Sequence, residues 1–197
     1  MVYIHADESC LGVQFTDRDS PGGAGGLIET FRKGLWVRRD FWISEPATTN
    51  NRMALRSAIE AVSALKAHPR VIFVSDSQYL VKGVREWLPA WIARGWKRKS
   101  GVLENEALWR KLAGVIMHHD IDWRWVRGHA GHARNEYANH LATRAARDQT
   151  QSPDLVPSRF EEWLEDQRDR YNKYFDFYES APPDPAETFA PAPRVRP

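Results

Sequence analysis

The stretch that most constrains the fold is VIFVSDSQYL, residues 71–80, in which an unbroken apolar run ends at a carboxylate. A near-continuous Val, Ile and Phe run is typical of a strand covered on both faces, as in α/β sheets. Ligands of open α/β sheets bind outside the carboxyl ends of the strands, which is where Asp76 lies. Asp76 is therefore a candidate for chemistry, although capping of the following helix would also explain an Asp at this point.

The composition is that of a soluble globular protein, with 42% hydrophobic and 27% charged residues in a chain of 197. No apolar run reaches the roughly 18 residues of a membrane span, and the N-terminal residues do not resemble a signal peptide. We therefore expect one main domain, a cytoplasmic location and no membrane contact. Cys10 is the single cysteine, which excludes an intrachain disulfide and a cysteine-based zinc site.

Charge is unevenly distributed along the chain. The residues before Ser152 hold 22 basic and 16 acidic side chains, whereas the residues from Ser152 onward hold six basic and ten acidic ones. A basic body predicts a polyanion as partner.

Hydrophobic periodicity predicts a layered α/β pattern with a mixed sheet. Residues 2–6 read as a first strand with Asp7 near its end, and residues 13–26 as a loop leading to a second strand. Gly34 separates that strand from a third one, which makes an antiparallel meander. Helices are predicted before Pro69, over residues 105–118 and from residue 134 to about residue 148, with a last strand at 121–126.

Two polar or basic segments suit nucleic acid. The cluster Thr48, Thr49, Asn50 and Asn51 exceeds what one helix cap requires, and such side chains with helix N-terminal amides bind phosphate oxygens. Residues 85–100 interleave aromatic and basic side chains, a combination that holds a nucleic-acid backbone but also fits a solvated amphipathic helix. The residues concerned are Trp87, Trp91, Arg94, Trp96, Lys97, Arg98 and Lys99.

The predicted loop 128–135 contains His129 and His132. A zinc site would need further ligands that the sequence does not place nearby. A general acid or base, or a phosphate-facing histidine, is the favoured interpretation.

The C-terminal part divides into a helix and a tail. Residues 158–178 open with Ser-x-x-Glu, a capping box, and carry aromatic residues at helical spacing. This stripe should dock on its own domain or on a protein partner. Six prolines from residue 182 onward predict a disordered tail. We therefore expect a domain over 1–150, a helical extension over 151–180 and a tail over 181–197.

Five motifs in the same order closely resemble the bacterial type 1 ribonuclease H family, and the resemblance covers about residues 1–148. The motifs are DESCLG at 7–12, TTNNRM at 48–53, SDSQY at 75–79, RGWK at 94–97 and GHAGH at 128–132. The resemblance implies a three-layer fold with a five-stranded mixed sheet, to which this chain adds a C-terminal helix.

The family's activity, which the resemblance implies, is hydrolysis of the RNA strand of RNA/DNA hybrids with two Mg²⁺ ions, or Mn²⁺, held by four carboxylates. Asp7 and Asp76 match two of the four positions. Ala54 and Asn139 stand where the family has Glu and Asp, which suggests weakened activity. Asn139 can still offer an amide oxygen and stays a candidate metal ligand and catalytic residue. Glu8 should point to the face opposite Asp7 and could reach the site only if the strand bends or ends there. Glu136, a little under one helical turn before Asn139, is the other possible source of charge.

By the same resemblance, His129 assists proton movement or product release, and Thr49, Asn50, Asn51 and Gln78 contact the hybrid. The Trp-rich and basic residues of segment 85–100 form the family's basic protrusion. We therefore predict a monomeric ribonuclease H type 1 enzyme. The alternatives are an inactive module that binds hybrids and recruits a partner through its C-terminal helix, and an enzyme inactivated by engineering.

Overall fold

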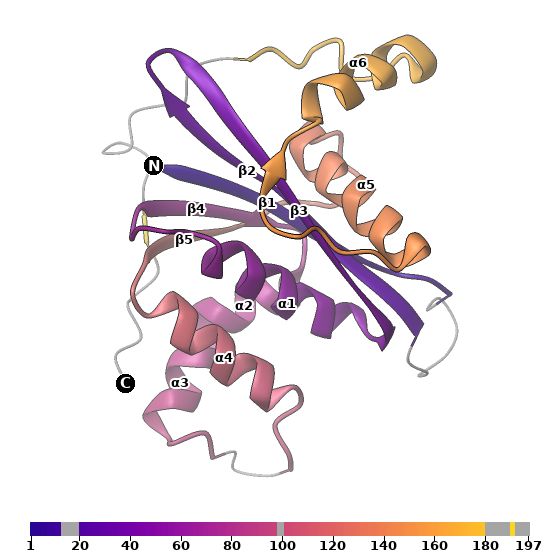
Figure 1. The fold of residues 1–197 in the computed structure, drawn as a ribbon. Coiled ribbons are helices and arrows are strands. Elements are labelled where there is room, and N and C mark those ends of the chain that lie inside the picture. Colours follow the sequence, from indigo (N-terminus) through magenta and orange to yellow (C-terminus); the bar gives the residue numbers. More distant parts are fainter. Residues whose placement is uncertain (13–19, 98–100, 180–189, 192–197) are drawn as a thin grey trace.

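A six-stranded mixed sheet forms the centre of the molecule (Figure 1). The computed structural model describes residues 1–12, 20–97, 101–179 and 190–191. The strand order is β5-β4-β1-β2-β3-β6. The strands are β1 (Val2–Cys10), β2 (Ser20–Arg32), β3 (Leu35–Thr48), β4 (Arg70–Ser75), β5 (Asp120–Trp125) and β6 (Val156–Pro157).

The first three strands form the predicted antiparallel meander, and β4 and β5 run parallel to β1. Lys33 and Gly34 have φ values of 51° and 80°, as a two-residue hairpin turn between twisted strands requires. Strand β4 pairs with β1 only as far as His5 and Val74. The end of β1 therefore extends beyond β4, and its edge is open at Asp7 and Glu8.

Helices cover both faces of the sheet (Figure 1). Helices α1 and α4 bury the large apolar cluster against β1, β4 and β5, whereas α5 packs on β1 and β2 from the other side. Thr49 caps α1, since its Oγ1 accepts a hydrogen bond from Arg52 N at 3.3 Å. The helices are α1 (Asn50–Ser63), α2 (Gln78–Lys82), the π-helical turn Gly83–Trp87, α3 (Leu88–Ala93), α4 (Glu106–Ile116), α5 (Ala133–Asp148) and α6 (Phe160–Tyr171).

The glycine run before residue 27 corrects one prediction. The sequence predicts a loop up to residue 26, but Gly22, Gly23, Gly25 and Gly26 lie within β2. A Cβ atom at Gly23 would overlap the backbone of α5 at Ala142 and Ala146. A Cβ atom at Gly25 would likewise overlap Leu141 and Ala142, so Gly23 and Gly25 let helix α5 lie directly on the strand.

The predicted α/β fold is confirmed, but the sheet has six strands because the C-terminal extension adds β6 to β3. Helix α6 is also shorter than the predicted 158–178. It begins at Phe160 and ends at Tyr171, where Asn172 takes a left-handed conformation with φ of 55°. Ser158 does not cap the helix, since its Oγ accepts from Phe160 N and Arg159 is the N-cap residue.

The aromatic residues of the extension divide into two sets. Phe160 and Leu164 are buried against Leu27, Tyr137 and Leu141, whereas Tyr171, Phe175 and Tyr178 are exposed. Apart from Ala190 and Pro191, the predicted tail falls outside the described residues, as do the basic residues Arg98 and Lys99. Among the described helices, none is long and apolar enough to cross a membrane.

Candidate active site

Three carboxylates meet at the carboxyl ends of the central strands. Asp7 and Glu8 come from β1, and Asp76 directly follows β4. Their ligand oxygens all lie within 4.8 Å of one another. In the part of the chain that the structure describes, this is the one group of three or more His, Cys, Asp or Glu side chains that could hold a metal ion.

Glu8 joins the acidic group although its side chain leaves β1 on the face opposite Asp7. Alternation along β1 places it on the α1 face together with Ile4 and Ala6, opposite Asp7, as predicted. Its carboxylate nevertheless reaches the cluster, because no strand flanks this part of β1 on the β4 side. The condition under which the sequence allows Glu8 to reach the site, a strand that bends or ends, corresponds to the end of β4 pairing at Val74.

Ala54 is fully buried on that same α1 face. It has no side-chain oxygen, so the third carboxylate of the site is that of Glu8. Glu8 Oε2 is buried, and no described group donates a hydrogen bond to it. A buried carboxylate oxygen without a donor is costly, and a bound cation would satisfy it.

Burial raises the pKa of all three carboxyls, and the charge of neighbouring carboxylates adds to this effect at Asp7 and Glu8. For Asp7 the main cause is desolvation, followed by the charge of Asp76, while donation from Glu8 N to Asp7 Oδ1 at 2.7 Å acts in the opposite direction. Burial also raises the pKa of Glu8, and the charges of Asp7 and Asp76 add to that effect. Desolvation raises the pKa of Asp76 as well. Such a cluster retains protons until a cation compensates its charge.

Two asparagines of α5 hold Asp7. Asn135 Nδ2 donates to Asp7 Oδ2 at 3.2 Å, and Asn139 also hydrogen-bonds to Asp7. Thr143 Oγ1 donates to Asn139 Oδ1 at 3.2 Å, which leaves the amide nitrogen of Asn139 for the carboxylate. Asn135 was not a predicted site residue. It is buried, and its Oδ1 has no partner among the described residues.

His129 lies at the solvent side of the cluster. Its side chain is 77% exposed, and its Nδ1 lies 3.6 Å from Glu136 Oε2. A positive charge on His129 would favour the ionised form of Asp76. Glu136, considered as a substitute ligand, therefore pairs with His129 and does not belong to the acidic group.

Gly128 sets the space available to Asp76, since a Cβ atom there would overlap Asp76 Oδ2. We expect Gly128→Ala to displace this carboxylate and to lower cleavage activity at least about tenfold, the cost of about 1.4 kcal/mol in the transition state. The assay is the rate of hybrid cleavage under single-turnover conditions. Gly114→Ala is the matched control, since a Cβ atom there meets open space on α4. Equal rates for both variants would contradict this role of Gly128.

The predicted nucleic-acid contacts occupy two places. Asn50 and Asn51 are exposed at the start of α1, and Gln78 is exposed at the start of α2. Farther away, Trp87 and Trp91 pack against the core and against each other, with ring centroids 5.9 Å apart. They support the protrusion from inside.

The outer part of the protrusion is basic. Arg94 and Lys97 are exposed, and the Arg110 guanidinium lies 4.6 Å from the ring centroid of the half-buried Trp96.

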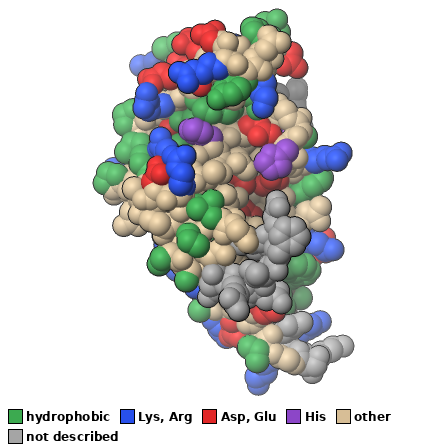
Figure 2. Space-filling view, turned by 90° about the vertical axis from the view of Figure 1, so that its right-hand side faces the viewer, with side chains coloured by type: hydrophobic (Ala, Val, Ile, Leu, Met, Phe, Trp, Pro, Cys, Tyr) green, Lys and Arg blue, Asp and Glu red, His purple; other side chains and the backbone are tan. Residues whose placement is uncertain are grey.

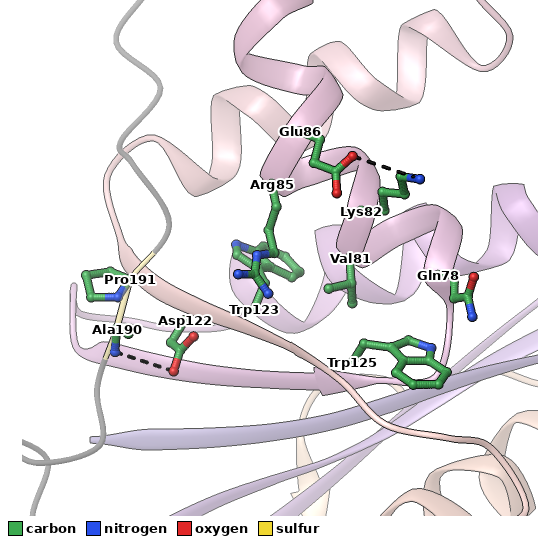
Figure 3. Close-up of a pocket in the computed structure, with 10 residues that line it drawn as sticks. All are labelled: Gln78, Val81, Lys82, Arg85, Glu86, Asp122, Trp123, Trp125, Ala190 and Pro191. Atoms are coloured by element: carbon green, nitrogen blue, oxygen red, sulfur yellow. Dashed lines mark hydrogen bonds and ion pairs between the residues drawn. The ribbon is translucent and has the colours of Figure 1, made fainter.

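A hollow of about 750 Å³ lies between α2, the π-helical turn and β5 (Figure 3). Gln78 and Trp125 line one end, and Ala190 and Pro191 lie at the other. Trp125 Nε1 donates to the backbone oxygen of Asp76 at 2.9 Å. This hydrogen bond connects β5 to the turn that presents the catalytic candidate.

Figure 2 shows the face on which charged groups gather: acidic side chains and two histidines lie among Lys and Arg side chains. This arrangement suits an acidic cluster that binds cations next to a surface that binds anions.

Comparison with known proteins identifies the family. Residues 1–147 match the RNase H family. The chain is 44% identical over 144 residues to a ribonuclease H of Stutzerimonas stutzeri, which covers 73% of this chain and 89% of the relative. It is 43% identical over 148 residues to a ribonuclease HI of Caulobacter vibrioides, covering 74% and 93%.

A solved structure matches nearly the whole chain. It is the crystal structure of LC9-RNase H1, described as a type 1 RNase H with the type 2 active-site motif. The TM-score is 0.87 at 51% identity, and the match covers 99% of this chain and 93% of the other. From the family match and these identities, the chain belongs to the ribonuclease H family.

Proposed function

We propose that this protein hydrolyses the RNA strand of RNA/DNA hybrids with divalent cations, Mg²⁺ in the first place, bound at Asp7, Glu8 and Asp76. The observation that carries the proposal is the position of Glu8. Its carboxylate joins the other two, and its buried Oε2 has no hydrogen-bond partner among the described residues. The site thus keeps three carboxylates, one more than the family motifs alone indicate.

The donor set fits a hard cation. Carboxylate oxygens with an amide oxygen nearby are the ligands that Mg²⁺ and Mn²⁺ take. The relative LC9-RNase H1 is a type 1 enzyme with the type 2 active-site motif. That description supports a rearranged but working acidic site in a chain 51% identical to it.

The proposal assigns a role to each residue of the site. When bound, two divalent cations stabilise the attacking and leaving oxygens of an in-line displacement. Asp7, Glu8 and Asp76 hold the cations, while Asn135 and Asn139 fix the orientation of Asp7. His129, exposed and next to Asp76, moves a proton or helps the product leave.

Two surfaces bind the substrate: the N-terminus of α1 and the basic protrusion. Asn50 and Asn51 lie at the N-terminus of α1, whose amides favour phosphate. The Thr49 hydroxyl caps α1 by accepting a hydrogen bond from Arg52 N. Arg94 and Lys97, with Arg98 and Lys99 outside the described residues, supply the phosphate contacts of the protrusion.

The direct test is cleavage of a labelled RNA/DNA hybrid with Mg²⁺ and, separately, with Mn²⁺. We expect the unaltered protein to cut the RNA strand and Asp76→Asn to bind the hybrid without cutting. Binding by the unaltered protein with no cleavage in either ion would favour the alternative of an inactive hybrid-binding module.

Cation binding should also stabilise the fold in a pH-dependent way. The three carboxyls have a raised pKa in the folded state, so their contribution to stability is present below their ordinary pKa and is lost as the pH rises. A cation replaces the protons, and its stabilisation should be larger at about pH 8 than at about pH 5. At a concentration about 100 times its dissociation constant it adds about 2.7 kcal/mol.

The measurement is the melting temperature with and without Mg²⁺ at both pH values. Glu136→Gln should keep the difference, since Glu136 lies outside the acidic group. Glu8→Gln should reduce it. A shift independent of pH, or unchanged in Glu8→Gln, would count against cation binding at this cluster.

The monomeric state, the cytoplasmic location and the division of the chain at residues 150 and 180 stay predictions. For the division, the structure supplies a qualification: β6 and α6 of the extension pack on the family domain.

A further inference from the structure

A groove of about 410 Å³ runs from the active site between α5 and the C-terminal extension. Asn139, which hydrogen-bonds to Asp7, lines its first part. Thr143 and Arg147 continue the same side of α5 away from the site, and Tyr171 and Lys173 form the opposite wall. The groove is therefore continuous with the place where the scissile phosphate would lie.

The extension is acidic overall, but the side that it turns to the groove is not. Helix α6 lines the groove with Trp163, Gln167 and Tyr171, which recur every four residues. Its acidic residues Glu161, Glu162, Glu165, Asp166 and Asp169 are absent from the lining. An acidic helix would repel a polyanion, so this segregation leaves the groove open to one.

The groove combines cations with aromatic rings. Arg144, Arg147 and Lys173 line it, although Arg147 also pairs with Asp148 at 2.7 Å. Among the described residues that line the groove there is one carboxylate, that of Glu136, and it pairs with His129 at the active-site end. Rings of Tyr171 and Tyr174 lie along the wall. Cations interleaved with aromatic rings are typical of surfaces that bind a single nucleic-acid strand.

The wall formed by the extension is held in place. Arg168 donates to the backbone oxygens of Tyr174 and Phe177 at 3.3 and 2.9 Å, which folds the chain back after α6. The buried Phe160 and Leu164 fix the helix itself. The groove is thus formed before any ligand binds, which lowers the entropic cost of binding.

We propose that this groove binds the RNA strand of the hybrid on one side of the cut. The inference rests on the proposed function and adds to it a binding surface contributed by the C-terminal extension. From Asn139 to Arg147, α5 rises about 12 Å, the length of about three stacked nucleotides. The extension therefore contacts the RNA for about three nucleotides beyond the scissile phosphate.

The test compares hybrids of different length. The variant Tyr171→Ala/Lys173→Ala removes two exposed groove residues, and Lys66→Ala/Lys111→Ala removes two exposed cations elsewhere. With a long hybrid we expect the groove variant to raise KM, and the dissociation constant measured by fluorescence anisotropy, about tenfold with kcat unchanged. The control should match the unaltered protein.

The location is tested by shortening the RNA strand from each end in turn to the cleavage position. The difference between groove variant and control should vanish for one truncation and persist for the other. Equal behaviour of the two variants on the long hybrid, or a loss that persists with both truncated strands, would overturn the proposal. A protein that binds hybrids but does not cleave them would refute the proposed catalysis, whereas the anisotropy comparison would still decide on the groove.

Discussion

Glu8→Gln should lower the rate of hybrid cleavage at least about 100-fold. A metal-held carboxylate supports several kcal/mol of charge stabilisation in the transition state, and each 1.4 kcal/mol corresponds to a factor of ten. The affinity for the hybrid, measured without cleavage, should change little. Glu8 belongs to the acidic group with Asp7 and Asp76, and the proposed phosphate contacts lie at other residues. The measurement is the single-turnover rate at saturating Mg²⁺. Glu165→Gln is the matched control, since Glu165 is exposed on α6 and does not line the groove beside α5.

A rescue experiment tests whether the position of the charge or its presence matters. In Glu8→Ala/Ala54→Glu the carboxylate moves from β1 to α1, into the volume that Glu8 leaves. Activity should return to within about tenfold of the unaltered protein, since the site again holds three carboxylates. Ala54→Glu alone should be destabilising, because Ala54 is fully buried and an added side chain overpacks its surroundings. Full activity of Glu8→Gln would show that Glu8 is no ligand.

The sequence predicted the parts of the site that depend on local pattern. The apolar run 71–75 located the end of β4, and with it Asp76, because a parallel buried strand has an unmistakable composition. Asp7 followed from the alternation of β1. The family motifs then identified Ala54 and Asn139 as departures from the expected ligand set.

Glu8 could not be placed from pattern alone. Alternation assigns each side chain to a face of the sheet, but it does not say where a neighbouring strand ends. Here β4 stops pairing at Val74, so side chains from both faces of β1 meet around an open edge. The sequence signal is a second acidic residue directly after Asp7 in a chain that has Ala at position 54. This combination could have indicated that Glu8 supplies the missing carboxylate.

Asn135 was missed for a related reason. An asparagine near the start of a helix is commonly read as part of the cap, and only the packing of α5 across β1 brings it to Asp7. The glycines of β2 show the same dependence on packing. A glycine-rich sequence by itself predicts a loop, whereas Gly23 and Gly25 lie within a strand and against the backbone of α5.

The C-terminal extension should contribute strongly to the free energy of unfolding. Phe160 is fully buried, and its ring lies edge-on to that of Tyr137 with centroids 5.4 Å apart. Around it, the buried Arg38 bonds Glu29 of β2 at 2.8 Å and Glu161 of α6 at 2.6 Å. Loss of the ring would leave a cavity between α5, α6 and β2.

We therefore expect Phe160→Ala to lower the free energy of unfolding by about 3–5 kcal/mol. For a chain of this size that corresponds to a melting temperature lower by about 10 °C. Tyr171→Ala, on the same helix but 57% exposed, should change stability by less than about 0.5 kcal/mol. The measurement is urea denaturation of both variants. If both unfolded like the unaltered protein, α6 would not be docked in solution, and its aromatic face would be free for the protein partner that the sequence also allowed.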